Sequence, residues 1–185
     1  MSFDYGVVFF LNHLAESSPF MKMMTVFFAQ YFPYLIAVVF LAWVMTRIIP
    51  RKDKLIRLVE GFGAALIARV GVVVLIRAFV SRTRPYVGDH AITAFISETS
   101  HSFPSGHATF FFALSTTVYL HNKRLGIWFY MASFIMGLAR VATGVHYPTD
   151  ILGGAILGIA VGWVTHRLVK QTPPPRLEDS APLLN

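Results

Sequence analysis

The sequence contains no cysteine and few charged residues. Without cysteine, disulfide bonds, catalytic thiolates and cysteine-ligated zinc or iron–sulfur centres are excluded. Asp, Glu, Lys and Arg make up 14% of the 185 residues, whereas a soluble domain carries about 25%. Because hydrophobic residues make up 55%, most of the surface is expected to face something other than water.

The few charges are mostly basic, and the formal net charge is +7. A basic balance fits either a nucleic-acid-binding protein or a membrane protein with a basic cytoplasmic face. The chain has no polar basic domain, so we favour the membrane protein and expect no nucleic-acid partner. The first ten residues contain Asp4 and no Lys or Arg, which is unlike a signal peptide. The spans themselves are therefore expected to direct insertion.

Long apolar runs predict an all-α, polytopic transmembrane helical bundle, because a helix needs about 20 apolar residues to cross a bilayer. The predicted spans are residues 32–49, 60–80, 107–121, 125–143 and 149–169. The earlier runs 3–14 and 18–31 are short or interrupted, and we expect interfacial or partly inserted helices there. A further crossing in this region would raise the count from five spans to six.

The sequence is thus divided into three parts. Residues 1–31 are assigned to the N-terminal interfacial or partly inserted helices, and residues 32–170 to a transmembrane domain. Residues 171–185 form a cytoplasmic tail, in which three consecutive prolines followed by polar residues predict disorder.

Basic residues gather in alternate connections between the predicted spans. They are Arg51, Lys52, Lys54, Arg57, Lys123, Arg124, Arg167, Lys170 and Arg176. The positive-inside rule makes their side of the membrane cytoplasmic. The 81–106 connection and the 143–149 turn then lie on the extracytoplasmic side, facing the periplasm or the cell exterior.

Three polar clusters fall on that extracytoplasmic side. They are Arg77 with Arg84-Pro85, the run Pro104-Ser105-Gly106-His107, and Arg140 with His146 and Asp150. The first lies at the end of the second span, the next at the start of the third, and the last across the turn between the fourth and fifth. Alternating topology brings all three to one membrane level.

Arg77 and Arg84 are seven residues apart, which predicts that they share one face of a helix. A guanidinium group offers a fixed fork of donors that matches phosphate oxygens. The alternative is that both side chains snorkel to the membrane surface. Arg77 lies deeper than snorkelling favours, and a charge inside the membrane is costly without a partner, which favours a bound anion.

The run from Pro104 to His107 has the pattern of a helix start, with Ser105 as the cap and Gly106 allowing a ligand to approach the backbone. Free N–H groups at a helix N-terminus attract anions, and His107 would stand beside them as a proton donor. An ordinary capped helix with an incidental histidine is the alternative.

His146 and Asp150 are four residues apart, so a carboxylate in the first turn of the last span can reach back to the imidazole. A carboxylate on one ring nitrogen fixes the tautomer and leaves the other nitrogen free as a nucleophile or base. Arg140 approaches from the preceding span. A purely structural His–Asp hydrogen bond is the alternative. No group of carboxylates suggests a bound divalent metal, and no cofactor is expected.

Other polar residues in or near the spans are given structural roles. Arg69 lies in the middle of the second span, where it could meet Glu60, a lipid phosphate or a polar interior; we favour an internal structural partner. His90 and His101 are expected to be exposed in the outer connection, with His101 near the site entrance.

The three clusters together resemble the three signatures of the type 2 phosphatidic acid phosphatase superfamily. That pattern is Lys, six residues, Arg-Pro; then Pro-Ser-Gly-His; then Ser-Arg, five residues, His, three residues, Asp. Order and spacing match from Arg77 to Asp150, and the flanking spans extend the resemblance over roughly residues 55–170. Two residues depart from the pattern, because Arg77 replaces the Lys and Ala139 replaces the Ser.

The resemblance implies a metal-independent reaction through a phosphohistidine. By it, His146 attacks phosphorus, Asp150 orients His146, and His107 protonates the leaving oxygen. The residues that would hold the phosphoryl oxygens are Arg77, Arg84, Ser105, Gly106 and Arg140.

Within the superfamily, the short chain and compact outer connection are most similar to bacterial undecaprenyl-diphosphate phosphatases. That similarity implies a lipid diphosphate substrate and a bacterial inner membrane. Phosphatidylglycerophosphate, phosphatidic acid and lipid A phosphatases share the same motifs and stay as alternatives. A metal-ion transporter and a non-catalytic lipid-binding protein are alternatives of another class. The sequence indicates no oligomeric state.

Overall fold

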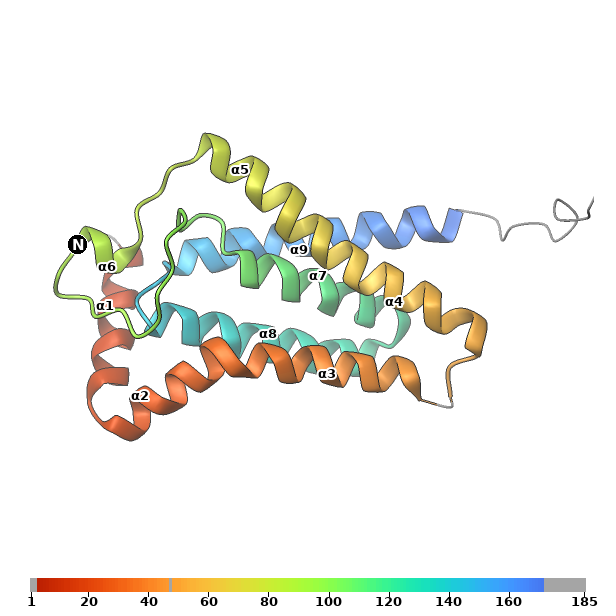
Figure 1. The fold of residues 1–185 in the computed structure, drawn as a ribbon, viewed down its shortest axis with the longest axis horizontal. Helices are drawn as coiled ribbons and strands as arrows, with labels where there is room; N and C mark the ends of the chain where they lie inside the picture. Colours follow the sequence, from red (N-terminus) through yellow and green to blue (C-terminus); the bar gives the residue numbers. More distant parts are fainter. Residues whose placement is uncertain (1–2, 47, 172–185) are drawn as a thin grey trace, which may run out of the picture.

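The computed structural model describes residues 3–46 and 48–171, and every regular element in this part of the chain is a helix. Figure 1 shows a bundle whose long helices run side by side along its length. In chain order the elements are α1 (Phe3–Glu16), α2 (Pro19–Val26), η1 (Phe27–Tyr31), α3 (Phe32–Met45), α4 (Arg51–Leu66), η2 (Ile67–Val72), α5 (Val73–Phe79), α6 (Pro85–Gly88), α7 (Gly106–His121), α8 (Lys123–Ala142) and α9 (Pro148–Gln171). Residues 172–185, most of the predicted tail, lie outside the described part.

Four helical stretches are long and apolar enough to cross a membrane: Pro19–Met45, Asp53–Phe79, Lys123–Ala142 and Pro148–Gln171. The last two agree with the predicted fourth and fifth spans. The break predicted at residue 31 is wrong, because α2, η1 and α3 form one continuous helix. A π-turn joins them, in which the N–H of Phe32 donates to Phe27 O, five residues back. This wider turn admits Pro33, which has no N–H to donate, near the start of α3.

Helix α7, the predicted third span, lies at the centre of the bundle. It has 16 residues, of which 11 are buried, and it packs against α4, α8 and α9. Its closest neighbour is α9, whose Gly154, Gly158 and Gly162 face it. A Cβ atom at these positions would lie 2.8, 2.4 and 2.8 Å from backbone oxygens of the α7 region. Only glycine permits so close an approach of two helices.

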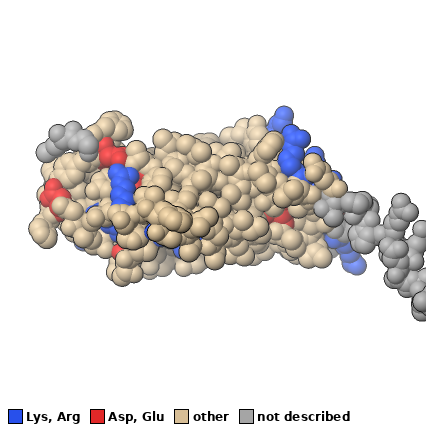
Figure 2. Space-filling view, turned by 90° about the horizontal axis from the view of Figure 1, so that it is seen from above, with Lys and Arg blue, Asp and Glu red and all other residues tan. Residues whose placement is uncertain are grey.

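The charged side chains gather near the two ends of the bundle. Figure 2 shows Lys and Arg towards both ends, separated by a broad band that is almost free of charge. Large apolar side chains are exposed along the bundle, including Leu75, Trp128 and Ile156, which are 60–66% exposed. Such a surface suits lipid rather than water.

The connections alternate between the two ends, as predicted for the later spans. The α3–α4 and α7–α8 connections lie at one end, and the α8–α9 turn lies at the other, together with α1, α6 and the loop that follows α6 (Figure 1). All three polar clusters of the sequence are therefore at the same end of the bundle.

Candidate active site

The N-termini of α7 and α9 meet at this end. Ser105 caps α7, and its hydroxyl accepts a hydrogen bond from the N–H of Ala108 at 3.5 Å. Its own N–H donates to Asp150 O at 3.1 Å, which links the two helix starts. The expectation of a capped helix at Ser105 is confirmed, and Gly106 and His107 open its first turn.

His146 is in the tight turn between α8 and α9, which needs a positive φ of 78° at Gly144. The imidazole is 1% exposed, and its Nδ1 lies 3.5 Å from Oδ2 of Asp150. Nδ1 is buried and has no hydrogen-bond partner among the described residues. Burial lowers the pKa of His146 well below its ordinary value, and the positive charges of Arg140 and Arg84 lower it further. The ring is therefore neutral and carries a lone pair at neutral pH.

Asp150 is fully buried and is held on both carboxylate oxygens. Oδ2 accepts from the N–H of Tyr147 at 2.8 Å, and Oδ1 accepts from Nη1 of Arg82 at 2.7 Å. Arg82 also forms an ion pair with Asp4 of α1 at 2.7 Å and lies over the ring of Tyr147. Sequence reasoning missed Arg82, whose position between Arg77 and Arg84 carries no motif. It connects α1 to the carboxylate that faces His146.

Arg77 and Arg84 meet at one residue, but they do not share a helix. Helix α5 ends at Phe79, and the chain is extended at Val80 and again at Arg84. The predicted common helical face is wrong because the last turn before Arg84-Pro85 is unwound, as expected for a residue that precedes proline. Both guanidinium groups instead bind Ser100, Arg77 at 2.8 Å and Arg84 at 3.3 Å to its Oγ.

The two arginines differ in how much of their donor capacity the protein uses. Arg84 is 3% exposed, and its donors reach the backbone oxygens of Ser100 and Val145 at 2.7 and 2.8 Å. Arg77 donates to Pro104 O at 2.9 Å, while its Nε is buried and has no partner in the described structure. Arg84 thus shapes the loop around the site, whereas Arg77 keeps a donor for a ligand.

Arg140 is 2% exposed and donates from Nη2 to Oε1 of Glu98 at 2.5 Å. The other oxygen of Glu98 lies 3.3 Å from Arg84. Burial alone would raise the pKa of Glu98, but the charge and hydrogen bond of Arg140 hold that pKa below its usual value. The ionised carboxylate of Glu98 therefore lies between the guanidinium groups of Arg140 and Arg84. These two arginines form a positively charged region that favours a bound anion. Glu98 also had no sequence signal.

A cavity of about 200 Å³ joins these groups. It is lined by Arg69, Val70, Val73, Val74, Arg77, Glu98, Gly106, His107, Arg140 and His146. Five predicted site residues therefore share one cavity: Arg77, Gly106, His107, Arg140 and His146. Ser105, Arg84 and Asp150 are not in the lining and lie behind it, where they hold the lining residues. His90 and His101 are exposed, as expected.

Arg69 belongs to this cavity, which corrects the expectation of an internal structural partner. It is exposed on η2, and its side chain lies beside Gly106, where an added Cβ would be 3.7 Å from Arg69 Cγ. Glu60 instead binds two histidines at the other end of the bundle. The sequence did contain a signal for this role of Arg69. A charged residue in the middle of a span indicates a functional site by default.

Comparison with known proteins places these residues in a family. The PAP2 superfamily model matches residues 58–173. The chain belongs to the PAP2 superfamily of phosphatases.

The bacitracin transport permease protein BcrC of Bacillus licheniformis is 28% identical to this chain, over 81% of this chain and 72% of that protein. The undecaprenyl-diphosphatase BcrC of Bacillus subtilis (strain 168) is 26% identical, over 89% and 83%. Among solved structures, LpxE of Aquifex aeolicus has the same fold, with a TM-score of 0.71 at 24% identity over 90% of this chain and 96% of that one. A PAP2-type phosphatidylglycerolphosphate phosphatase from Bacillus subtilis gives 0.65 at 20% identity, over 94% and 87%.

Proposed function

We propose that this membrane lipid phosphatase hydrolyses undecaprenyl diphosphate to undecaprenyl phosphate and inorganic phosphate. The observation that carries the proposal is the cavity in which the neutral imidazole of His146 faces arginines and the start of α7. The similarity to an undecaprenyl-diphosphatase over most of both chains supports the choice of lipid.

The reaction is assigned to two histidines acting in turn. The free ring nitrogen of His146 attacks the terminal phosphorus, while Asp150 stabilises the charge that develops on the ring. The bond to the bridging oxygen breaks, and His107 gives that oxygen a proton, so undecaprenyl phosphate leaves. Water then attacks the phosphohistidine, His107 takes up its proton, and phosphate is released.

Charge stabilisation is assigned to the remaining lining residues. Arg77, Arg140 and the N–H groups at Gly106 receive the oxygens of the transferred phosphoryl group, with Ser105 and Arg84 fixing their positions. The carboxylate of Glu98 is displaced from Arg140 when the substrate phosphate enters. The 3.5 Å gap between His146 and Asp150 closes in the complex, as catalytic hydrogen bonds often do.

Arg69 is assigned to the second phosphate of the diphosphate. It lies on the side of the cavity formed by Val70, Val73 and Val74 of η2 and α5. Val70 and Val74 are 61% and 59% exposed, so this wall continues into the apolar surface, where a prenyl chain would extend. A phosphate attached to that chain would pass Arg69 before the terminal phosphate reaches His146.

We further propose five crossings, with α7 as the short one. Its 16 residues span roughly 24 Å, less than the hydrocarbon thickness, but α7 is enclosed by other helices and hardly meets lipid. The basic residues of the α3–α4 and α7–α8 connections mark the cytoplasmic side. The site then faces the outside of a bacterial cytoplasmic membrane.

The test is phosphate release by the purified protein in detergent, wild type beside His146→Ala. The substrates are undecaprenyl diphosphate, phosphatidylglycerophosphate, phosphatidic acid and lipid A. We expect the fastest release from undecaprenyl diphosphate, loss of release in His146→Ala, and no inhibition by added EDTA. A faster reaction with another lipid would overturn the assignment of undecaprenyl diphosphate as the substrate. Equal release by His146→Ala would overturn the mechanism, whereas no release from any of the four lipids would turn attention to a lipid-binding or transport role.

A further inference from the structure

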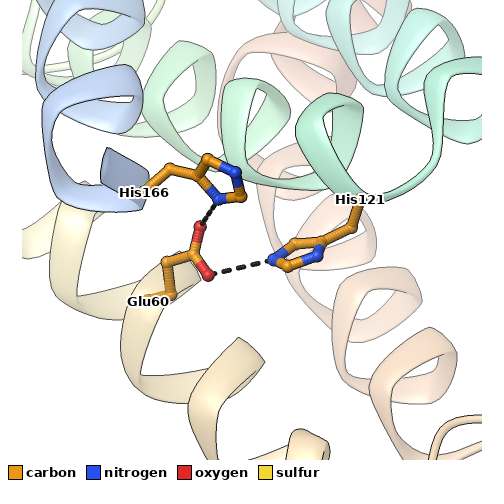
Figure 3. A group of neighbouring side chains, drawn as sticks. All are labelled: Glu60, His121 and His166. Atoms are coloured by element: carbon orange, nitrogen blue, oxygen red, sulfur yellow. Dashed lines mark hydrogen bonds and ion pairs between the residues drawn. The ribbon is translucent and has the colours of Figure 1, made fainter. Parts of the chain in front are cut away.

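A second polar cluster lies at the other end of the bundle. Glu60 of α4, His121 of α7 and His166 of α9 point towards one another (Figure 3). Oε1 of Glu60 is 2.6 Å from Nδ1 of His166, and Oε2 is 2.9 Å from Nε2 of His121. His121 ends α7, whereas the catalytic cavity is at its start, so roughly 24 Å separates the two sites. The reaction at His146 does not use this cluster.

The carboxylate in this cluster is almost completely buried. Glu60 is 1% exposed and His166 is 5% exposed, and burial of an ionised group is costly unless an opposite charge accompanies it. Among the described residues, its ion-pair partners are the two histidines alone.

The basic side chains nearby are turned elsewhere. Arg57 lies over the ring of Trp43 at 5.3 Å, and Arg167 lies over Trp163 at 4.9 Å. Neither guanidinium group forms an ion pair with Glu60, so no Lys or Arg among the described side chains balances its carboxylate.

We propose that Glu60, His121 and His166 bind a divalent transition-metal ion of the zinc class. Two imidazole nitrogens and a carboxylate oxygen are a common set of three protein ligands for such an ion. The three donor atoms already lie within 4.8 Å of one another. Donors about 2.0–2.2 Å from a tetrahedral zinc ion are roughly 3.3 Å apart, so side-chain movements of less than about 1 Å would admit the metal.

The fourth ligand position fits a water molecule. His121 is 19% exposed, whereas the other two residues are nearly buried, so the metal reaches the site past His121. The bound ion would join α4, α7 and α9 at this end of the bundle. Metal binding of this kind adds to folding stability and takes no part in phosphate transfer.

The test uses the full-length protein in detergent, with any affinity tag removed and bound metal stripped by a chelator and dialysed away. Co²⁺ is added while the visible absorption of tetrahedral cobalt is followed, and Zn²⁺ is then used as a competitor. We expect one equivalent of Co²⁺ per chain, displaced by Zn²⁺. Glu60→Gln and His166→Ala should each weaken binding at least about tenfold, and His121→Gln serves as a milder third variant at the most exposed ligand.

Two controls locate the metal. The double variant His107→Ala/His146→Ala should bind Co²⁺ as the wild type does, which separates this site from the catalytic histidines. Zn²⁺ should raise the unfolding temperature of the wild type but not of Glu60→Gln. No tetrahedral cobalt spectrum in the wild type, or unchanged affinity in the ligand variants, would overturn the proposal and leave a hydrogen-bonded cluster. Phosphate release is a separate readout, so failure here does not affect the proposed function.

Discussion

Replacement of Arg82 by Ala tests whether the carboxylate behind His146 must be held from both sides. Arg82 donates to Asp150 at 2.7 Å and to Asp4 at 2.7 Å, and 29% of its side chain is exposed. A charge-assisted hydrogen bond contributes about 1.5–3 kcal/mol, and partial exposure places this one near the middle, at about 2 kcal/mol. Asp150 would keep the N–H of Tyr147 and a hydrogen bond with the side chain of Ser102.

The expected result is a lower rate of chemistry with little change in substrate binding. If the full 2 kcal/mol, roughly, is lost from the transition state, kcat falls about 30-fold, because about 1.4 kcal/mol corresponds to a tenfold change in rate. KM should change little, since Arg82 is not in the cavity lining. Both constants come from steady-state phosphate release with undecaprenyl diphosphate.

Asp4→Asn is the matched control, because it removes the outer partner of Arg82 and leaves the contact to Asp150 in place. We expect a much smaller fall in kcat for this variant. Wild-type kcat in Arg82→Ala, or an effect confined to KM, would refute the assignment of Arg82 as a positioning residue.

Three further predictions concern the anion, the nucleophile and the helix packing. Arg69→Ala should raise KM for undecaprenyl diphosphate more than for a lipid monophosphate, and equal changes for both would contradict its assignment to the second phosphate. Because the pKa of His146 is lowered, its neutral form persists as the pH falls. The acid limb of log kcat against pH should therefore lie below the usual imidazole pKa of about 6.5. An acid limb at or above that value would contradict the assignment of His146 as the nucleophile. Gly158→Ala places a Cβ 2.4 Å from Thr109 O and should cost about 1–3 kcal/mol of stability. Gly63→Ala has open space and should be neutral or stabilising in the same thermal unfolding measurement.

The sequence predicted the helices around the site better than those at the edge of the bundle. The runs 107–121, 125–143 and 149–169 agree within two residues with α7, α8 and α9, because turns and caps such as Ser105 bound them clearly. The continuous helix through Pro33 was not predictable from periodicity, because a π-turn has no simple pattern.

Site residues that belong to a sequence motif were predictable, whereas those in irregular loops were not. Arg77, His107, Arg140 and His146 meet in one cavity as expected from their spacing. Their catalytic roles stay predictions. Glu98 and Arg82 come from irregular segments, where position in space follows from tertiary contacts and leaves no mark in the sequence. The cluster of Glu60 with two histidines was missed because its members are up to 106 residues apart.

The glycine contacts between α7 and α9 have a mechanical consequence. At three glycines of α9 the backbone lies directly against the backbone of the α7 region, so these contacts resist a change in the distance between the two helices. His107, the proposed proton donor, is on α7, and Asp150, the carboxylate beside the proposed nucleophile, is on α9. Their separation is therefore fixed by the packing of the two helices. If the cavity widens to admit a lipid, the movement is expected on its other side. That side is formed by the exposed η2–α5 stretch and the loop that carries Glu98.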